Sequence, residues 1–327
     1  MEVHTGLAKD REDDKRFRQS RDRHEGFQIG QYLNMPPMFF TRDRHPIWCN
    51  DMYRGCPVFI IASGSSFASI DTNLLQRPGV VTMGLNNSVK SFRPNLWCSV
   101  DNPQNFMKSI WLDPKIQKFV PICHSEKNLF DNERWEEIKT KVGDCPNVFY
   151  YSRNEHFRHE QYLFEDTINW GCHGEIECSC GYKGCRSVML AAIRIVYLLG
   201  FRTVFLLGTD FKMDAKHKYH FEQERSKGSI NNNNKTYKAL DARFSALQPI
   251  FKQNNFNIFN CVEDSGLHAF PFMDYTEAVK YTTQFLPEDC TKERSEGLYD
   301  RKANAEKVVK TRTIKTLESY IEGMNDE

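Results

Sequence analysis

The sequence has none of the features that mark a protein embedded in a membrane. All of its apolar runs fall well short of the roughly 18 residues that cross a bilayer. The first residues contain no apolar signal segment, so secretion is not predicted. We therefore expect a cytoplasmic protein without a membrane span.

Net charge is also nearly absent. The 327 residues include 44 Lys and Arg against 43 Asp and Glu, which gives a formal net charge of +1. This balance excludes a protein that is basic overall and binds nucleic acid through charge alone, although it leaves a local basic groove open. The hydrophobic fraction of 40% is ordinary for a folded globular chain.

Three common catalytic signatures are missing as well. The chain contains no Gly-x-Gly-x-x-Gly fingerprint, no Walker loop and no Gly-x-Ser-x-Gly elbow. Their absence argues against the usual dinucleotide-binding domains, the P-loop ATPases and the hydrolases with a serine triad.

Cysteine is present in an odd number, 11 residues, which rules out complete pairing within the chain. No Cys-x-x-Cys pair occurs, and we expect reduced thiols. A short cluster nevertheless contains the thiol and imidazole groups that bind zinc, and zinc is kept as the alternative. The cluster consists of Cys172, His173, Cys178, Cys180 and Cys185.

The chain does contain short apolar runs separated by helical patterns. Continuous apolar runs are typical of strands that are buried on both faces, and helices between them indicate parallel pairing. The runs cover residues 57–62, 80–83, 96–100, 119–122, 148–150, 203–207 and 256–260, with helices expected over 187–199 and 236–252. The sequence therefore predicts an α/β fold with a Rossmann-like, mostly parallel sheet flanked by helices.

The predicted sheet occupies the middle of the chain. We expect one nucleotide-binding domain over residues 39–286, preceded by a mobile, charged arm over residues 1–38. The charged tail over residues 287–327 has apolar residues at helical spacing, which predicts a short amphipathic helix.

Small and polar residues follow the predicted strands at the edge where parallel α/β sheets bind ligands. Ser63, Gly64, Ser65 and Ser66 follow the first run, and such a turn can direct backbone N–H groups at an anion. The alternative is a plain helix cap. The next two runs lead to Asn86 and Asn87, then to Asp101 and Asn102, which can read a base or ribose or simply close Asx-turns.

The run over 203–207 leads to Gly208, Thr209 and Asp210. Asp210 can accept ribose hydroxyls or act as an acid or base. A charged segment follows, whose cations can neutralise a diphosphate and whose histidines can move a proton. Its candidate residues are Lys212, His217, Lys218, Tyr219, His220 and Arg225. A solvated charged loop is the alternative, and residues 231–234, all Asn, are expected in a loop before the next helix.

The order of these motifs resembles a family of bacterial and phage proteins known as DUF115 or as glycosyltransferases. The resemblance is carried by the Ser-Gly-Ser-Ser turn, Asn-Asn, Asp-Asn-Pro, residues 186–190 and Gly-Thr-Asp-Phe, and it covers roughly residues 53–280. The chain is more distantly similar to single-Rossmann bacterial sialyltransferases, a variant of the GT-A fold, and to archaeal hydroxymethylpterin diphosphokinases.

The resemblance implies a role for each motif. The residues that it places against the nucleotide or donor are Ser63, Gly64, Ser65, Ser66, Asn86, Asn87, Asp101, Asn102, Ser187, Gly208 and Thr209. His220, or else His217, replaces the base histidine of the sialyltransferases, and Asp210 orients ribose or acceptor. The implied leaving-phosphate contacts are Lys212, Lys218, Tyr219 and Arg225.

These observations together predict a glycosyltransferase that uses a nucleotide sugar and no other cofactor. Because no Asp-x-Asp motif is present, metal independence is expected. The acceptor is left open between a glycan and a modified DNA base, and the oligomeric state is not predicted. The alternatives are a diphosphokinase acting with ATP and Mg²⁺ on a hydroxymethyl heterocycle, or a nucleotide-binding module without catalysis.

Overall fold

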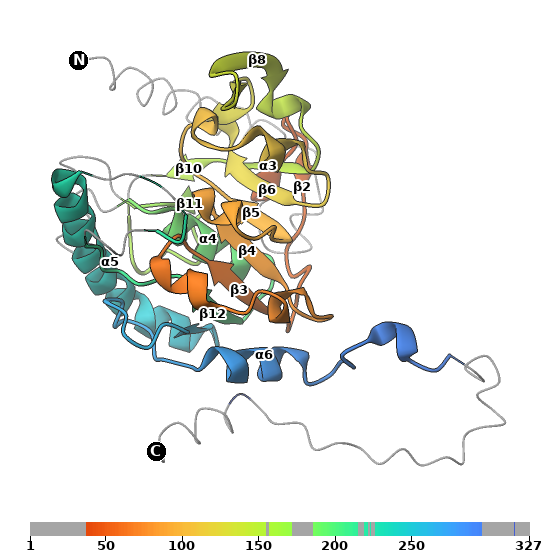
Figure 1. Cartoon of the computed structure of the whole chain (residues 1–327), viewed down its shortest axis with the longest axis vertical. Coiled ribbons are helices and arrows are strands. Elements are labelled where there is room, and N and C mark those ends of the chain that lie inside the picture. Colours follow the sequence, from red (N-terminus) through yellow and green to blue (C-terminus); the bar gives the residue numbers. More distant parts are fainter. Residues whose placement is uncertain are drawn as a thin grey trace. The chain divides into compact units, whose positions relative to one another are not determined.

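A nine-stranded sheet runs through the described part of the chain (Figure 1). The computed structural model describes residues 37–154, 157–171, 186–214, 219–221, 223, 226–295 and 317. In spatial order the strands are β13 (Asn257–Asn260), β12 (Thr203–Leu207), β3 (Pro57–Ile61), β4 (Thr82–Leu85), β5 (Leu96–Cys98), β6 (Gln117–Pro121), β9 (Val148–Tyr151), β1 (Phe39–Phe40) and β2 (Pro46–Ile47).

Pairing is parallel from β13 to β9, and only β1 and β2 at one edge pair antiparallel in this sheet. The predicted α/β fold with a mostly parallel sheet is thereby confirmed. Successive strands from β3 to β6 extend in one direction, whereas β12 returns to the other side of β3 and continues to β13. The strand order therefore reverses between β3 and β12, which is where such sheets leave a crevice for ligands.

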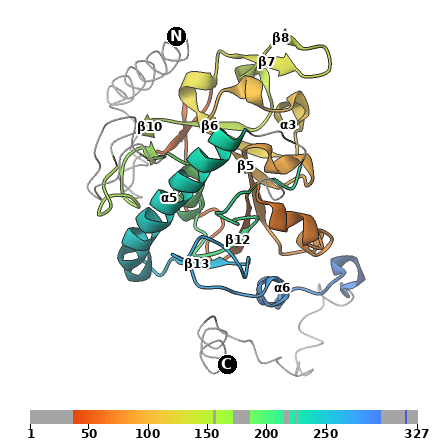
Figure 2. The same cartoon turned by 60° about the vertical axis from the view of Figure 1, so that its left-hand side comes forward.

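The two faces of the sheet support separate apolar clusters, because side chains alternate along each strand. On β5, Leu96 and Cys98 join one cluster and Trp97 joins the other. On β6, Phe119 and Val120 divide in the same way. Helices α4 (Val188–Leu198) and α5 (Lys227–Gln253) pack on the first face, and Figure 2 shows α5 running obliquely across the sheet. The second face is covered by the segment that includes α3 (Lys108–Leu112).

Helix α4 begins where the sequence predicts. Ser187 precedes it, and its Oγ accepts a hydrogen bond of 3.1 Å from the N–H of Met189. An N-terminal cap of this kind satisfies one of the backbone donors that a helix leaves unpaired. The helix is almost entirely buried, which agrees with its nearly continuous apolar sequence.

Helix α5 begins earlier than predicted, and the expected loop over 231–234 is wrong. Ser226 caps the helix by accepting from the N–H of Ser229, so the asparagines lie inside the first turns. Asn234 is held there by tertiary contacts: its Oδ1 accepts from the N–H of Met213, and its Nδ2 donates to the carbonyl of Met213. These two bonds outweigh the weak helix propensity of asparagine.

Several smaller elements complete this part of the chain. Strands β7 (Asn128–Asp131) and β8 (Glu136–Lys141) form an antiparallel hairpin, and β10 (Arg153–Asn154) pairs in parallel with β11 (Ile168–Asn169). Short 3₁₀ helices follow the strand ends: η1 (Ser65–Ser69), η3 (Asn86–Lys90), η4 (Pro103–Asn105), η5 (Ile122–His124) and η6 (Val142–Asp144).

A second compact unit combines residues 71–80 with the described residues from 274 onward. It contains η2 (Leu74–Gln76), α6 (Tyr275–Thr283) and η7 (Cys290–Lys292). Within it, Tyr275 Oη donates to the carbonyl of Asp71 at 2.8 Å, and Arg77 pairs with Glu288 at 3.3 Å. Nearly all of the predicted arm over 1–38, and most of the predicted tail over 287–327, lie outside the described residues.

No helix among the described residues is both long enough and apolar enough to cross a membrane.

Candidate functional site

The turn after β3 meets the turn after β12 at the point where the strand order reverses. The N–H of Gly64 donates to the carbonyl of Gly208 at 2.8 Å. Gly208 has a φ of +65°, and Gly64 has a φ of −67°. A Cβ at Gly64 would overlap the carboxylate of Asp210 and the carbonyl of Gly208. Glycine is therefore needed at position 64 because the turn after β12 comes too close for a side chain. It is not needed for a left-handed backbone, as it is in many tight turns.

Asp210 occupies donors that the sequence analysis assigned to a ligand. Its carboxylate accepts hydrogen bonds from the Ser66 N–H at 3.2 Å and from Ser66 Oγ at 2.9 Å. The start of η1 is thus already satisfied by a carboxylate of the chain itself. An anion cannot bind to the Ser66 N–H unless Asp210 moves.

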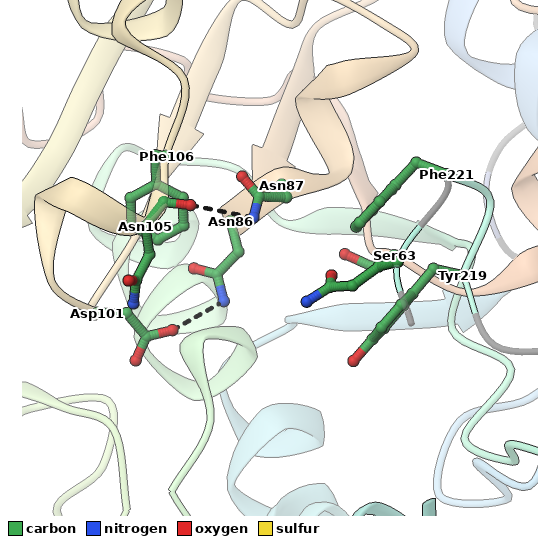
Figure 3. A pocket seen from close by; sticks show the side chains of 9 residues that line it. Ser63, Asn86, Asn87, Asp101, Asn105, Phe106, Tyr219 and Phe221 are labelled. Carbon is green, nitrogen blue, oxygen red and sulfur yellow. Dashed lines mark hydrogen bonds between the residues drawn. The ribbon is translucent and has the colours of Figure 1, made fainter. Parts of the chain in front are cut away.

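A pocket of about 410 Å³ lies at the carboxyl ends of β3, β4 and β5. We call it the amide pocket, and its lining residues are Ser63, Asn86, Asn87, Asp101, Asn105, Phe106, Tyr219, Phe221 and Gln223. Figure 3 shows Asn86, Asn87, Asn105 and Asp101 on one side and the rings of Tyr219 and Phe221 on the other. The structure therefore brings five predicted residues together: Ser63, Asn86, Asn87, Asp101 and Tyr219.

The amide side of the pocket is held by hydrogen bonds. Asn86 has a φ of +48°, and its carbonyl accepts from the indole Nε1 of Trp97 at 2.9 Å. Its side-chain Nδ2 donates to Asp101 Oδ2 at 3.3 Å, and Asn87 Nδ2 donates to the Asn105 carbonyl at 3.3 Å. These bonds fix the amides of Asn86 and Asn87, which follow β4, against the segment that follows β5 (Figure 3).

The opposite side presents two parallel rings. Tyr219 and Phe221 are stacked, with centroids 5.2 Å apart and planes inclined by 3°. The N–H of His220, which lies between them in sequence, donates to the carbonyl of Ser63 at 3.2 Å. This bond attaches the aromatic pair to the turn that follows β3.

Asp101 is the acidic group of the amide pocket. Part of the Asp101 side chain is exposed to solvent, but the protein around the pocket excludes water from the carboxylate. This desolvation raises the pKa of Asp101. The positive charges of Arg153 and Arg186 oppose this effect. Both guanidinium groups lie over the ring of Trp170, at 5.0 and 4.9 Å from its centroid. Two cations, one on β10 and one just before α4, therefore act on the pocket.

A second pocket, of about 450 Å³, lies beside the same turn. We call it the carboxylate pocket, and it is lined by Ser65, Asp210, Lys212, Met213, Asp214 and Asp264. Lys212 Nζ forms an ion pair with Asp264 Oδ2, which lowers the pKa of Asp264. The structure thus places Ser65, Asp210 and Lys212 together, apart from the residues of the amide pocket.

His220 lines neither pocket. Its ring is half-buried, hydrogen-bonded through Nδ1 to Ser91 Oγ at 3.0 Å, and in contact with Phe67 at a centroid distance of 5.0 Å. Its Nε2 is buried without a hydrogen-bond partner among the described residues. Burial lowers the pKa of His220 to about 4, so its ring is uncharged at neutral pH.

Three other predicted residues have local structural contacts. Asn102 Oδ1 accepts from the Gln104 N–H and caps η4, and Ser187 caps α4. Thr209 is buried, and its Oγ1 donates to Asn260 Oδ1 at 2.7 Å. None of the three lines either pocket.

The remaining predicted residues lie outside the described part of the chain. His217, Lys218 and Arg225 lie outside the described residues, as does the whole candidate zinc cluster, which consists of Cys172, His173, Cys178, Cys180 and Cys185. Among the residues that are described, no three His, Cys, Asp or Glu side chains come together as a metal site.

Sequence reasoning missed several residues of the amide pocket. Asn105 and Phe106 follow the predicted Asp101-Asn102 motif by a few positions, so its continuation into η4 was an available signal. Phe221 and Gln223 lie in a segment that was interpreted only through its cations, histidines and tyrosine. Arg153 carries no local signal, because only the fold brings it near Asp101.

No protein-family model matches the chain, and no curated protein matches it significantly. The DUF115 resemblance therefore stays a prediction. Among solved structures, the chain is similar to the MAf glycosyltransferase from Magnetospirillum magneticum AMB-1, at 14% identity and a TM-score of 0.39. That match covers 84% of this chain but only 39% of that protein, so the chain spans less than half of its length.

The chain is also similar to the sialyltransferase CstII from Campylobacter jejuni, solved with the substrate analogue cytidine-5'-monophosphate. The identity is 13% and the TM-score 0.36, and the match covers 67% of this chain and 85% of that one. Both of these structural neighbours are glycosyltransferases.

Proposed function

We propose that the amide pocket binds the nucleotide of a sugar nucleotide and that the protein is a glycosyltransferase. The observation that carries the proposal is the pairing of amide groups with two stacked rings at the carboxyl ends of β3, β4 and β5. This edge, next to the reversal of strand order, is where open α/β sheets bind nucleotides.

The lining of the pocket offers contacts for both parts of a nucleoside, the base and the ribose. Stacking on Tyr219 and Phe221 accommodates the flat face of a base, an interaction of about 1–3 kcal/mol per base. Asn86 and Asn87 line the pocket with amide groups, a type of side chain that carries both donors and acceptors. Asp101 is an acceptor for ribose hydroxyls, and the positive charges of Arg153 and Arg186 offset part of the burial that raises its pKa.

In this proposal the donor phosphates lie near Ser63, at the mouth of the amide pocket next to Gly64. Lys218 and Arg225 keep the role that the resemblance implies, which is to supply positive charge to the leaving phosphate, and no metal ion is required. Lys212 loses that role, because it lines the carboxylate pocket and pairs with Asp264. We assign His220 a positioning role instead of the base role that the resemblance implies. Its ring is shielded and its pKa is about 4, whereas its N–H holds the aromatic pair against Ser63.

A thermal-shift assay tests the proposal. The purified protein is heated with CMP, UDP, GDP or ADP, each with and without EDTA, and separately with ATP and Mg²⁺. A nucleotide at a hundredfold excess over its Kd adds about 2.7 kcal/mol of stability, which raises the Tm measurably. We expect one of these nucleotides to raise the Tm equally in the presence of EDTA.

The variant Tyr219→Ala is expected to weaken that nucleotide by about tenfold through loss of stacking. Phe164→Ala, which removes an exposed ring that lines neither pocket, is the matched control and keeps full affinity. A Tm that no nucleotide changes would refute the proposal. A shift that requires ATP with Mg²⁺ would favour diphosphate transfer instead.

A further inference from the structure

We propose that the carboxylate pocket is the acceptor site, that it binds a neutral or amine-bearing sugar, and that Asp210 takes the proton of the attacking hydroxyl. This inference rests on the proposed function, because it assigns the second substrate of the same reaction. It also decides between the two acceptor classes that the sequence leaves open, a glycan and a DNA base.

The first argument is the arrangement of two pockets around one turn. Ser63 lines the amide pocket and Ser65 lines the carboxylate pocket, with only Gly64 between them in sequence. The volumes, about 410 and 450 Å³, both lie in the range of small-molecule sites. Group transfer needs two substrates held close together, and one shared turn between two pockets meets that need.

The second argument is the fixed position of Asp210. Its carboxylate is held by the N–H and Oγ of Ser66, and its backbone carbonyl accepts from the N–H of Gly266 at 2.7 Å. Ser265 Oγ also donates to that carbonyl at 3.2 Å. A carboxylate offers about four lone-pair sites, so these contacts leave acceptor capacity for a substrate hydroxyl.

The third argument is charge. Of the carboxylates that line the carboxylate pocket, Asp264 is paired with Lys212, whereas the Asp210 carboxylate accepts only from the uncharged Ser66 and faces no cation among the described residues of the pocket. Such a lining repels the phosphates of nucleic acid and the carboxylates of acidic sugars. It favours hydroxyl groups, which donate to carboxylates, and amines, which pair with them.

The step that this geometry supports is a direct displacement. The acceptor oxygen forms a bond to the anomeric carbon of the donor sugar, and the bond from that carbon to the phosphate oxygen breaks. The electron pair of the broken bond goes to the phosphate, and the proton of the acceptor hydroxyl goes to the carboxylate of Asp210. No oxidant, reductant or further reactant is needed.

The experiment combines binding and transfer. The probe acceptors are methyl glucoside, methyl galactoside and glucosamine, compared with glucuronic acid and a 20-base-pair DNA duplex. Saturation-transfer NMR measures binding of the small probes, and a filter-binding assay measures the duplex. Mass spectrometry measures transfer from UDP-glucose, UDP-galactose, GDP-mannose and CMP-N-acetylneuraminic acid. We expect the neutral or amine-bearing sugars to bind and accept, and the two anionic probes to do neither.

Variants separate the roles of the two pockets. Asp210→Asn is expected to lower turnover at least a hundredfold while the nucleotide-induced Tm shift is kept. Asp264→Asn, at an exposed residue whose change does not threaten folding, is expected to alter acceptor KM about threefold or more at unchanged kcat and nucleotide affinity. Asp43→Asn, an exposed carboxylate that lines neither pocket, is the control and changes nothing.

Several outcomes would overturn the inference without touching the proposed function. They are a preference for the anionic probes, no binding of any probe sugar to the wild-type protein, or full turnover in Asp210→Asn. Loss of the nucleotide shift in Asp264→Asn, with Tyr219→Ala unaffected, would place the nucleotide in the carboxylate pocket. The proposed function itself is refuted by other results: no nucleotide shift in the wild-type protein, or a nucleotide that binds in the carboxylate pocket instead of the amide pocket.

Discussion

Gly64 is the residue on which the contact between the β3 and β12 turns depends. Any side chain there would overlap the Asp210 carboxylate and the Gly208 carbonyl, and the second of these is backbone that cannot swing away. We expect Gly64→Ala to lower the free energy of unfolding by about 3 kcal/mol, measured by urea denaturation.

The matched control is Gly228→Ala, in the first turn of α5. A Cβ at Gly228 meets only Ser226 Oγ at 3.8 Å, so this change is expected to stabilise the protein by about 0.5–1 kcal/mol. Equal effects of the two alanines would contradict the close approach described at Gly64.

Glu165 gives the stability a pH dependence of a definite sign. Burial raises the pKa of Glu165 from 4.5 to about 7, although Asn154 and Asn169 each donate to it. The folded state therefore holds this proton at a pH where the unfolded state has lost it. As a result, the free energy of unfolding falls as the pH rises from about 4.5 to 7.

The variant Glu165→Gln removes this titration. Because the side chain is only partly buried, we expect the variant to be more stable than the wild type by about 1–2 kcal/mol at pH 8, and this difference to vanish near pH 4. Denaturant titrations at both pH values measure it. Glu160→Gln, at an exposed neighbour, serves as the control, and an identical pH profile in all three proteins would count against the effect.

At the scale of elements, one buried lysine connects the loop that precedes β6 with the loop that precedes β9. Lys118 on β6 is fully buried, and its Nζ donates to the carbonyls of Asp113, Ile116 and Pro146 at 2.7, 2.9 and 2.8 Å. Asp113 and Ile116 precede β6, and Pro146 precedes β9. A methionine at this position keeps the length of the side chain but leaves these carbonyls without that donor.

We therefore expect Lys118→Met to lower the free energy of unfolding by about 3 kcal/mol. Lys115→Met, at an exposed lysine of the same loop, is expected to change it by less than about 0.5 kcal/mol. Thermal and urea unfolding of both variants measure the difference. A loss of similar size in both would mean that the loop depends on charge instead of on the buried donors.

The sequence predicted elements well where an apolar pattern decided them. The strands β3, β4, β12 and β13 and helix α4 follow from continuous apolar runs and a serine cap. The start of α5 was wrong because the residues that stabilise it, Met213 among them, are distant in sequence. The hairpin of β7 and β8 was missed, since its second strand, Glu136–Lys141, is almost entirely polar.

For the site, the sequence predicted which strands are followed by pocket-lining residues, but it did not predict that these residues line two separate pockets. Ser63 and Ser65 were assigned to one anion, whereas they line different pockets. The reason is that the Ser66 N–H, which was expected to bind the anion, already donates to Asp210. The two residues are 144 positions apart in the sequence, so the pattern gives no sign of this contact. Pattern alone also could not separate Asn86, which lines a pocket, from Asn102, which caps a 3₁₀ helix.

At the scale of the whole molecule, the reversal of strand order between β3 and β12 determines where the two pockets lie. The chain builds β3 to β6 on one side and returns through α4 to place β12 against β3. The turns after β3 and β12 are then neighbours although about 145 residues separate them. Two pockets on the flanks of one such junction are the arrangement that a reaction between two substrates requires.

The indole of Trp97 adds a practical consequence. It is buried, lies 4.9 Å from Trp111, and is joined by one hydrogen bond to Asn86 at the wall of the amide pocket. Trp135, in contrast, is 79% exposed, so dissolved acrylamide quenches its emission selectively. A compound that displaces Asn86 changes the polarity around the Trp97 indole. Its binding is therefore expected to shift the wavelength of the tryptophan emission, and no added label is needed to detect it.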